Sequence, residues 1–334
     1  MTEPLLWVQN LTTVFDVKPR PVVAVKDVSF EIRKGETLGL VGESGSGKSV
    51  TAFSIIGLLQ PPGRVAGGRV LFQGRDLAQL AEPEMRQVRG AGIGFVFQEP
   101  MAALNPVMRV GAHIAEALIV HGLASKGEAR DRAVELLRAV KITDPEKRVD
   151  DYPHQLSGGM RQRVMMAVAL ACKPPLLIAD EPTTALDVTV QAQVLDLLRD
   201  MKAQFDLSLL LITHDLGVIA ETADRVAVMY AGRIVEQGTV REIFHEPKHP
   251  YTRGLLASIP GGAAGSRLQA IDGTVPNLAS LPPGCSFAPR CGDRMAVCGT
   301  AFPPVTHLGG GPSPGLPASA GEHAVRCYLH GGRP

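Results

Sequence analysis

The stretch of sequence that decides the fold is Gly42-Glu43-Ser44-Gly45-Ser46-Gly47-Lys48-Ser49. It fits the pattern G-x-x-x-x-G-K-S/T at every fixed position. An apolar run, Glu36 to Val41, precedes it, and a stretch of helical character follows it as far as Leu59. A strand, a glycine-rich loop and a helix in this order bind phosphate, because the glycines let backbone N–H groups turn inward and the helix N-terminus carries partial positive charge. The sequence therefore predicts a nucleotide-binding loop, and a glycine-rich turn with a chance lysine is the weaker interpretation.

Two side chains of this loop have specific expected roles. Lys48 should reach the β- and γ-phosphates of a nucleoside triphosphate, and the Ser49 hydroxyl should ligate Mg²⁺. The residues expected to contact the nucleotide here are Gly42, Glu43, Ser44, Gly45, Ser46, Gly47, Lys48, Ser49 and Val50.

An acidic pair forms the second candidate element of the site. The apolar run Leu176 to Ala179 predicts a buried strand, and Asp180 and Glu181 follow it directly. Asp180 is expected to hold Mg²⁺ through water, and Glu181 to orient or deprotonate the attacking water. Such a pair is weak evidence by itself, and it gains its weight from the phosphate loop in the same chain.

The order of the remaining segments predicts an α/β fold. Alternating apolar residues from Leu5 to Ile32 indicate antiparallel strands with one wet face. Helical periodicity runs from Gly111 to Asp150 and again from Ser157 to Cys172. Further strands are predicted at 68–72 and 92–97. From Leu176 onward strands and helices alternate, which favours a mostly parallel sheet covered by helices.

Bulk composition restricts the class of protein. The 334 residues carry a net charge of +1 with no long basic run, which argues weakly against a nucleic-acid-binding surface. Met1 to Asn10 has no basic region before an apolar stretch, so no secretory signal is expected. The most apolar stretch, Val164 to Cys172, is too short to span a bilayer. We expect a soluble cytosolic chain whose membrane role comes through partners.

Four of the five cysteines lie near the C-terminus, with the spacing C-x5-C-x6-C-x28-C. Zinc sites usually pair cysteines two to four residues apart, so these spacings are wide for zinc. Four thiolates in a loop-rich cytosolic segment suit an iron–sulfur cluster, while zinc and free thiols stay open as alternatives. Cys172 is expected to be a small core residue. Gly, Pro, Ala and Ser dominate residues 260–320, and Gly309 to Gly321 is predicted to be a low-complexity linker or loop.

Several short motifs make residues 5–245 resemble the ABC ATPase family. Leu156-Ser157-Gly158-Gly159-Met160 resembles its signature motif, with Met160 in place of the commoner glutamine. Thr184-Ala185-Leu186-Asp187 resembles the D-loop. Gln98 resembles the Q-loop glutamine, and His214 resembles the switch histidine. Phe15 is similar to the aromatic residue that stacks on adenine. The resemblance implies a P-loop NTPase fold with a RecA-like core, an antiparallel β subdomain and a helical subdomain at about 99–172, within a nucleotide-binding domain at 1–250.

The resemblance also implies a mechanism. Two such chains would hold two ATP molecules between one chain's phosphate loop and the other's signature motif, with Asp187 at the seam. Glu181, His214 and Gln98 would be the catalytic residues. Ser49, Gln98 and Asp180 would be the Mg²⁺ ligands. The nucleotide would close the pair and hydrolysis would open it, which is a ligand-driven shift between two states.

The C-terminal part resembles the extension of oligopeptide and dipeptide importer ATPases. The matching segments are His249 to Leu256 and Gly284 to Cys291. The resemblance implies an extension at 251–334 that holds a 4Fe–4S cluster, or alternatively zinc, at Cys285, Cys291, Cys298 and Cys327. The histidines of this part are expected to lie at the surface or in turns: His245, His249, His307, His323 and His330.

The resulting hypothesis is the ATPase subunit of a peptide importer on the cytoplasmic face of the cell membrane. Its implied partners are a second, related ATPase, two membrane permeases and an external solute-binding protein. Dipeptides, oligopeptides, glutathione and nickel chelates cannot be told apart from this chain. The alternatives are a non-transport ABC ATPase acting on nucleic acid or ribosomes, and a nucleotide-binding regulatory subunit without turnover. Intact Glu181 and His214 argue against the last of these.

Overall fold

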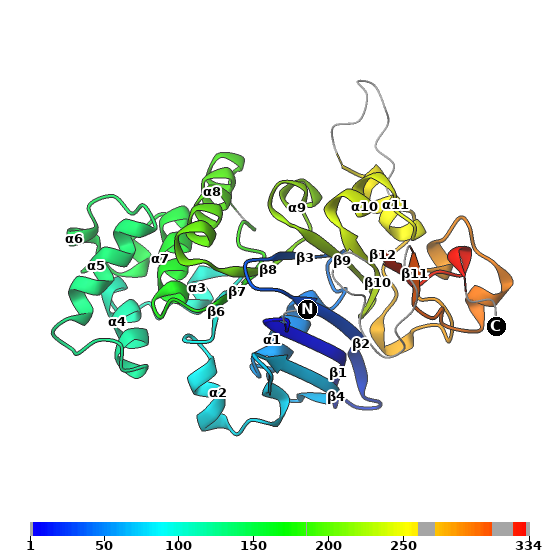
Figure 1. Ribbon diagram of the computed structural model, residues 1–334, viewed down its shortest axis with the longest axis horizontal. Coiled ribbons are helices and arrows are strands. Elements are labelled where there is room, and N and C mark those ends of the chain that lie inside the picture. The colour runs from blue at the N-terminus through cyan, green and yellow to red at the C-terminus, as the bar shows by residue number, and fades with distance from the viewer. Residues whose placement is uncertain (1–2, 185, 260–270, 309–322, 332–334) are drawn as a thin grey trace. The chain divides into compact units, whose positions relative to one another are not determined.

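The computed structural model describes residues 3–184, 186–259, 271–308 and 323–331 (Figure 1). The predicted low-complexity segment Gly309 to Gly321 and Ala185 of the D-loop motif lie outside the described residues. The chain divides into two compact units. The first unit comprises Met1–Arg33, Thr37–Gln79 and Thr213–Pro334, and the second comprises Lys34–Glu36 and Leu80–Ile212.

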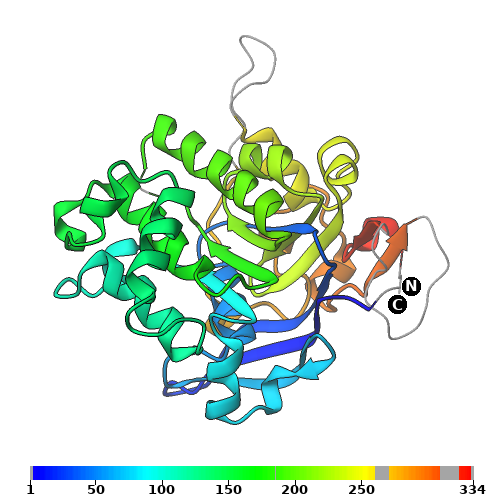
Figure 2. The same ribbon diagram turned by 60° about the vertical axis from the view of Figure 1, so that its left-hand side comes forward.

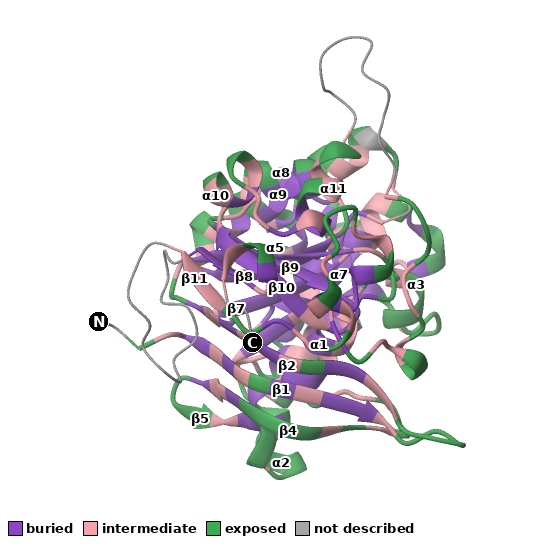
Figure 3. Cartoon of the chain, turned by 90° about the vertical axis from the view of Figure 1, so that its right-hand side faces the viewer, coloured by how far each residue is buried: buried purple, intermediate pink, exposed green. Residues whose placement is uncertain are grey.

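An antiparallel sheet forms one layer of the first unit. Its strand order is β2 (Val22–Ile32), β1 (Leu6–Phe15), β4 (Gly63–Phe72) and β5 (Arg75–Asp76). The antiparallel strands predicted at residues 5–32 are thus confirmed. The strand predicted at 68–72 begins earlier, because Gly63 to Gly67 also pair with β1. This extension shows no apolar pattern because none of Gly63 to Gly67 is buried, and Figure 3 shows exposed stretches along β4.

A second sheet of the first unit contains the strand that precedes the phosphate loop. Here β3 (Thr37–Val41) runs parallel to β9 (Arg225–Tyr230), and β9 pairs antiparallel with β10 (Arg233–Thr239). Every residue of β3 and β9 is buried, as expected for strands covered on both faces.

Two short strands of the C-terminal part extend this sheet. Antiparallel pairing joins β12 (His323–Val325) to β10 and β11 (Thr306–Leu308) to β12 (Figure 1). The sequence did not predict them, because three residues are too few to show a period of two. The helices of the first unit are α1 (Lys48–Ile55), α9 (Leu216–Thr222), α10 (Val240–His245) and α11 (Pro250–Ala257).

The second unit contains three parallel strands, β6 (Ile93–Val96), β7 (Leu176–Asp180) and β8 (Ser208–Thr213). All residues of β7 and β8 are buried, which explains their unbroken apolar runs. The long helix α8 (Val188–Phe205) connects these two strands, and α2 (Glu82–Val88) precedes β6. The parallel strands predicted from the alternation after Leu176 are confirmed.

Five helices of the second unit, α7 among them, form one group (Figures 1 and 2). The helical stretch predicted at 111–150 is three helices, because Gly122 adopts a φ of +66° and ends the first of them, and Pro145 opens the third. The boundaries proposed for a helical subdomain at 99–172 and for a C-terminal extension at 251–334 stay predictions. The five helices are α3 (Pro100–Ala103), α4 (Val110–Val120), α5 (Ala129–Ala139), α6 (Pro145–Arg148) and α7 (Gly158–Leu170).

Within the described ranges, no helix combines the length and the apolar character needed to cross a membrane.

Candidate nucleotide-binding site

The phosphate loop links β3 to α1, and its backbone requires glycine at two places. Gly47 precedes α1 with a φ of +103°, and a Cβ atom there would lie 2.8 Å from the carbonyl oxygen of Ala24. A Cβ atom on Gly42 would lie 2.1 Å from the carbonyl oxygen of Met229. The loop is therefore packed against β2 and β9 so closely that only glycine fits.

Lys48 lies inside this loop, with only 5% of the residue exposed. Its Nζ atom donates to the carbonyl oxygens of Gly42 and Glu43, at 2.8 and 3.2 Å. Two carbonyl oxygens thus hold the ammonium group against the loop. A phosphate oxygen could take their place, because it would form a stronger, charge-assisted hydrogen bond with the ammonium group. The buried hydroxyl of Ser46 finds no hydrogen-bond partner in the described part of the chain, which also suits a loop built for a ligand.

Phe15 is the last residue of β1 and is half-buried. Its ring packs on the backbone of Gly63, where an added Cβ atom would approach the ring to 2.8 Å. The proposed stacking of this ring on adenine stays a prediction.

The predicted catalytic glutamate and glutamine lie together in the second unit. Asp180 ends β7 and is buried, and Glu181 follows it with a φ of +46°. One carboxylate oxygen of Glu181 accepts hydrogen bonds from the Gln98 amide at 3.1 Å and from the Thr184 hydroxyl at 2.9 Å. The left-handed conformation costs a non-glycine residue about 1–2 kcal/mol, and such strain is concentrated at functional positions. Thr184 had been assigned only to the D-loop motif, and the structure adds its contact with Glu181.

The signature motif begins α7, and its residues form the N-terminus of a thirteen-residue helix. The Ser157 hydroxyl accepts a hydrogen bond from the Met160 N–H group at 3.3 Å, so Ser157 is the N-cap. Leu156 is buried and anchors the segment, while Ser157 and Gly158 are exposed. A helix N-terminus that carries glycine N–H groups and a hydroxyl is suited to binding an anion.

Asp187 caps the neighbouring helix α8 by accepting a hydrogen bond from Val190 N at 2.9 Å. A Cβ atom on Gly159 would lie 2.8 Å from a Val190 methyl group, so glycine permits the close approach of α7 and α8. Both helix N-termini line one open groove, together with Lys141 and Arg163. Sequence reasoning missed these two cations, because Lys141 comes from a separate segment and the motif does not show that Arg163, on α7, lines the groove.

His214 follows β8 directly and is exposed. The next residue, Asp215, caps α9 by accepting hydrogen bonds from Gly217 N and Val218 N. The proposed contact of His214 with a γ-phosphate stays a prediction.

The four C-terminal cysteines line a single cavity in the first unit. Burial raises the pKa of the Cys285, Cys291 and Cys327 thiols, that of Cys327 to about 11, and the neighbouring thiols add to these increases. Among the residues that the structure describes, no group of three or more His, Cys, Asp or Glu side chains has a metal-binding arrangement. The structure therefore brings the four sulfurs to one place without showing a formed metal site.

His249 lines the same cavity and is buried, so its predicted position at the surface or in a turn is wrong. It caps α11, where its Nδ1 atom accepts a hydrogen bond from Tyr251 N at 3.0 Å. An accepting Nδ1 requires the tautomer with hydrogen on Nε2. That Nε2 atom is buried and has no partner in the described segments. Burial lowers the pKa of His249 to about 4, so the ring is neutral at physiological pH.

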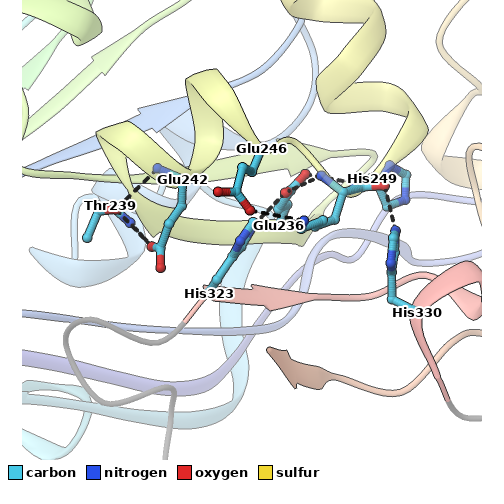
Figure 4. A network of polar contacts seen from close by, with 8 residues as sticks. Glu236, Thr239, Glu242, Glu246, His249, His323 and His330 are labelled. Carbon is cyan, nitrogen blue, oxygen red and sulfur yellow. Dashed lines mark hydrogen bonds and ion pairs between the residues drawn. The ribbon is translucent and has the colours of Figure 1, made fainter. Parts of the chain in front are cut away.

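A network of polar contacts holds His249 in its position (Figure 4). The Glu236 carboxylate, on β10, accepts hydrogen bonds from Lys248 N at 2.7 Å and His249 N at 2.9 Å, and lies 2.7 Å from His323 Nε2. His323, on β12, is buried too, which corrects its predicted exposed position. Burial raises the pKa of Glu236, but the bonds from His323 and the backbone outweigh it and the net pKa is below the usual value. One carboxylate thereby ties β10, α11 and β12 together.

Two family models match the chain. The family described as "ABC transporter" matches residues 25–184, and "Oligopeptide/dipeptide transporter, C-terminal region" matches residues 235–298. The second match includes His249, Tyr251 and the first three of the four clustered cysteines.

Curated relatives are similar along nearly the whole length. The dipeptide transport ATP-binding protein DppD of Bacillus subtilis is 51% identical over 329 residues, covering 98% of this chain and 95% of that protein. The oligopeptide transport ATP-binding protein AppD of the same organism is 52% identical, covering 98% of this chain and 97% of that protein.

Solved structures of ATP-binding cassettes share the fold. A dimeric, post-hydrolysis state of the cassette MJ0796 bound to ADP and Pi is 30% identical with a TM-score of 0.64, and covers 71% of this chain and 99% of that chain. The cassette cbiO1 of Clostridium perfringens is 28% identical with a TM-score of 0.62, and covers 73% of this chain and 92% of that one.

Proposed function

Since this chain belongs to the family of ABC transporter ATP-binding proteins, in its dipeptide and oligopeptide transport group, we propose that it binds and hydrolyses ATP to power a peptide importer. The observation that carries the proposal is the joint presence of a glycine-restricted phosphate loop around Lys48 and the hydrogen-bonded pair of Gln98 and Glu181. The match of the C-terminal region to oligopeptide and dipeptide transporters supports peptides as the cargo.

Each residue has a defined part in the proposed reaction. Lys48 and the loop N–H groups hold the terminal phosphates of ATP. Glu181 orients the attacking water and accepts its proton, while Gln98 and Thr184 hold the Glu181 carboxylate in place. Ser49, Gln98 and Asp180 are the proposed ligands of Mg²⁺, since hydroxyl, amide and carboxylate oxygens suit this cation, which when bound would neutralise phosphate charge. His214 contacts the γ-phosphate.

A second ATPase chain completes the proposed motor. Its nucleotide would lie on the groove that the N-termini of α7 and α8 form with Lys141 and Arg163. The groove's two helix N-termini and two cations suit the γ-phosphate of the partner's ATP. ATP would then join the two chains, and loss of the γ-phosphate would release them.

The remaining partners are two membrane permeases and an external solute-binding protein. Apolar side chains are exposed on and near α3 and α4, with Val107 79% and Val120 68% exposed. Apolar surface of this kind can be covered by a partner protein where it is contiguous. These exposed side chains support the docking of permease helices here, which would place the chain at the cytoplasmic face of the membrane.

The four cysteines are the proposed ligands of a 4Fe–4S cluster, with zinc as the alternative. Two observations support a bound group: Cys285, Cys291, Cys298 and Cys327 share one cavity, and His249, which also lines it, has a buried Nε2–H without a partner among the described residues. An N–H donor beside thiolates or sulfide is the usual means of stabilising a cluster's negative charge. When bound, the cluster would crosslink a segment that has few aliphatic residues.

The hydrolytic role is tested with Glu181→Gln. Loss of a general base typically lowers turnover by about 10²–10⁴-fold, so ATP hydrolysis should fall by at least a hundredfold while ATP binding persists. Glu221→Gln, at an exposed position on α9, is the matched control and should keep wild-type turnover. Turnover by Glu181→Gln at the wild-type rate would reject the proposed role.

The cluster is tested with anaerobically purified protein. The wild type should be brown and contain iron, and Cys291→Ser should lose both the colour and the iron. Cys172→Ser is the matched control, since this fifth cysteine lies in the second unit. A colourless wild type that contains stoichiometric zinc would overturn the cluster in favour of zinc.

A further inference from the structure

Glu43, the second residue of the phosphate loop, is held by side chains from the C-terminal part of the chain. Arg290 forms a two-pronged ion pair with its carboxylate, with Nη1–Oε2 at 2.8 Å and Nη2–Oε1 at 3.1 Å. The Tyr251 hydroxyl accepts a hydrogen bond from Glu43 N at 2.9 Å. The remaining polar group of Glu43, its carbonyl oxygen, accepts a hydrogen bond from Lys48 Nζ. Every polar group of this loop residue is therefore engaged.

Both of the holding groups are themselves fixed. The Arg290 side chain is only 5% exposed and also donates to the carbonyl oxygens of Asp272 and Ile271, at 2.9 and 3.2 Å. Tyr251 is fully buried, and its ring packs against those of Tyr230 and Phe287, with centroids 4.5 and 5.4 Å apart. Because these side chains are already fixed, they hold the phosphate loop without losing much more conformational entropy when a ligand binds.

The negative charge of Glu43 links its ion pair with Arg290 to the binding of a nucleotide. The carboxylate belongs to the loop that must attract a polyphosphate, and an unpaired negative charge there would repel it. The fork of Arg290 satisfies both carboxylate oxygens and cancels the charge. The low exposure of Arg290 limits screening by solvent, so the pair differs from an ordinary surface salt bridge.

We infer that Arg290 and Tyr251 are positioning residues of the ATP site, which hold Glu43 and thereby set the affinity of the phosphate loop for ATP. This inference rests on the proposed function, and it gives the C-terminal region a direct part in nucleotide binding. Arg290 immediately precedes Cys291, so the same short turn supplies both a cavity cysteine and the partner of the loop.

The test measures the Kd for MgATP in the full-length protein, using Glu181→Gln as the background to prevent hydrolysis. Arg290→Ala should raise the Kd about tenfold, and Arg290→Lys should recover part of the loss because it keeps the charge without the fork. Glu43→Gln removes the charge that Arg290 cancels. Arg290→Ala made in the Glu43→Gln protein should therefore have little further effect, and this non-additivity would assign the loss to the pair.

A matched control comes from the same region. Arg253, on α11, forms an exposed ion pair with Asp293, two residues after Cys291, and neither residue contacts the loop in the described contacts. Arg253→Ala should leave the Kd unchanged. An equal loss of affinity in Arg253→Ala and Arg290→Ala would overturn the inference, because it would reflect a general disturbance of the region.

Tyr251→Phe keeps the buried ring and removes only the hydroxyl that accepts from Glu43 N. It decides the question if Arg290→Ala fails to fold, and it should raise the Kd by several-fold with an unchanged unfolding midpoint. If Tyr251→Phe, and Arg290→Ala where it folds, bind MgATP with the wild-type Kd, the positioning role is refuted while the proposed function stands. Failure of the parent protein to bind MgATP would instead refute the proposed function.

Discussion

Replacing Glu236 with Gln tests whether the buried network in Figure 4 holds the C-terminal part to the nucleotide-binding part of the first unit. The substitution changes the size of the side chain very little. It removes the charge and turns one of the two accepting oxygens into an NH₂ donor, which then faces either a backbone N–H group or His323. The variant therefore leaves at least one buried donor without an acceptor.

The expected cost follows from the burial of the carboxylate, which is 1% exposed. Hydrogen bonds to a charged group contribute about 1.5–3 kcal/mol each, and a buried donor left without an acceptor adds a desolvation penalty of about 1–3 kcal/mol. Because the remaining oxygen still accepts from one of the two backbone N–H groups while the other loses its acceptor, we expect a loss of about 3 kcal/mol of unfolding free energy. The matched substitution Glu246→Gln affects a 71% exposed carboxylate that forms an ion pair with Lys248, and it should cost less than about 0.5 kcal/mol.

Urea unfolding followed by tryptophan fluorescence is the assay, since the chain has one tryptophan, Trp7, on β1 of the first unit. The net pKa of Glu236 in the folded protein is below its ordinary value of 4.5. Its ionised form therefore contributes stability above that value, and the contribution is lost as the pH falls toward the folded-state pKa. The difference between wild type and Glu236→Gln should be constant from pH 8 to 6 and shrink progressively below about pH 4.5. A difference below about 0.5 kcal/mol at pH 7, or one that does not change with pH, would refute the reasoning.

Two further predictions concern nucleotide contacts. Ser157→Ala removes the N-cap of α7 and the hydroxyl proposed to meet the partner's ATP, so MgATP-dependent dimerisation in a Glu181→Gln background should weaken while monomeric ATP binding stays the same. Analytical ultracentrifugation measures this, and an unchanged dimer would contradict the role. Phe15→Ala should raise the Kd for ATP by about tenfold, because stacking of a base on an aromatic ring contributes about 1–3 kcal/mol. Fluorescent ATP titration measures the Kd, with GTP as a comparison, and a wild-type Kd would exclude stacking at Phe15.

Local signals were sufficient for much of the fold. The phosphate loop lies between a strand and a helix as predicted, because its glycines meet a conformational demand that is confined to a few residues. The buried strands β7 and β8 appear as unbroken apolar runs. The stretch 111–150 was harder, since one helical period continued across Gly122 and Pro145, where the structure breaks it into three helices.

The sequence predicted which residues form the candidate site better than it predicted the contacts between them. Gln98 and Glu181 were both singled out by motif, and the structure adds the hydrogen bond between them and the help of Thr184. Lys141 was missed because it reaches the groove of the signature motif from a separate segment, and Arg163 because the motif does not show which face of α7 lines the groove. The sequence predicts His249 and His323 at the surface or in turns, because their scatter fits no zinc template. Both are buried and contact the Glu236 carboxylate, which the sequence does not indicate.

The sequence by itself determined the nucleotide chemistry of this protein, because that chemistry depends on glycines, a lysine and carboxylates at short, fixed spacings. The four C-terminal cysteines share one cavity, as their predicted role as common ligands requires. Only the tertiary structure decided that Glu43 is held by Arg290 and Tyr251, 247 and 208 residues further along the chain. The physical reason is that hydrophobic periodicity and turn chemistry act over a few residues. Contacts between distant segments depend instead on how whole layers pack, which no local pattern records.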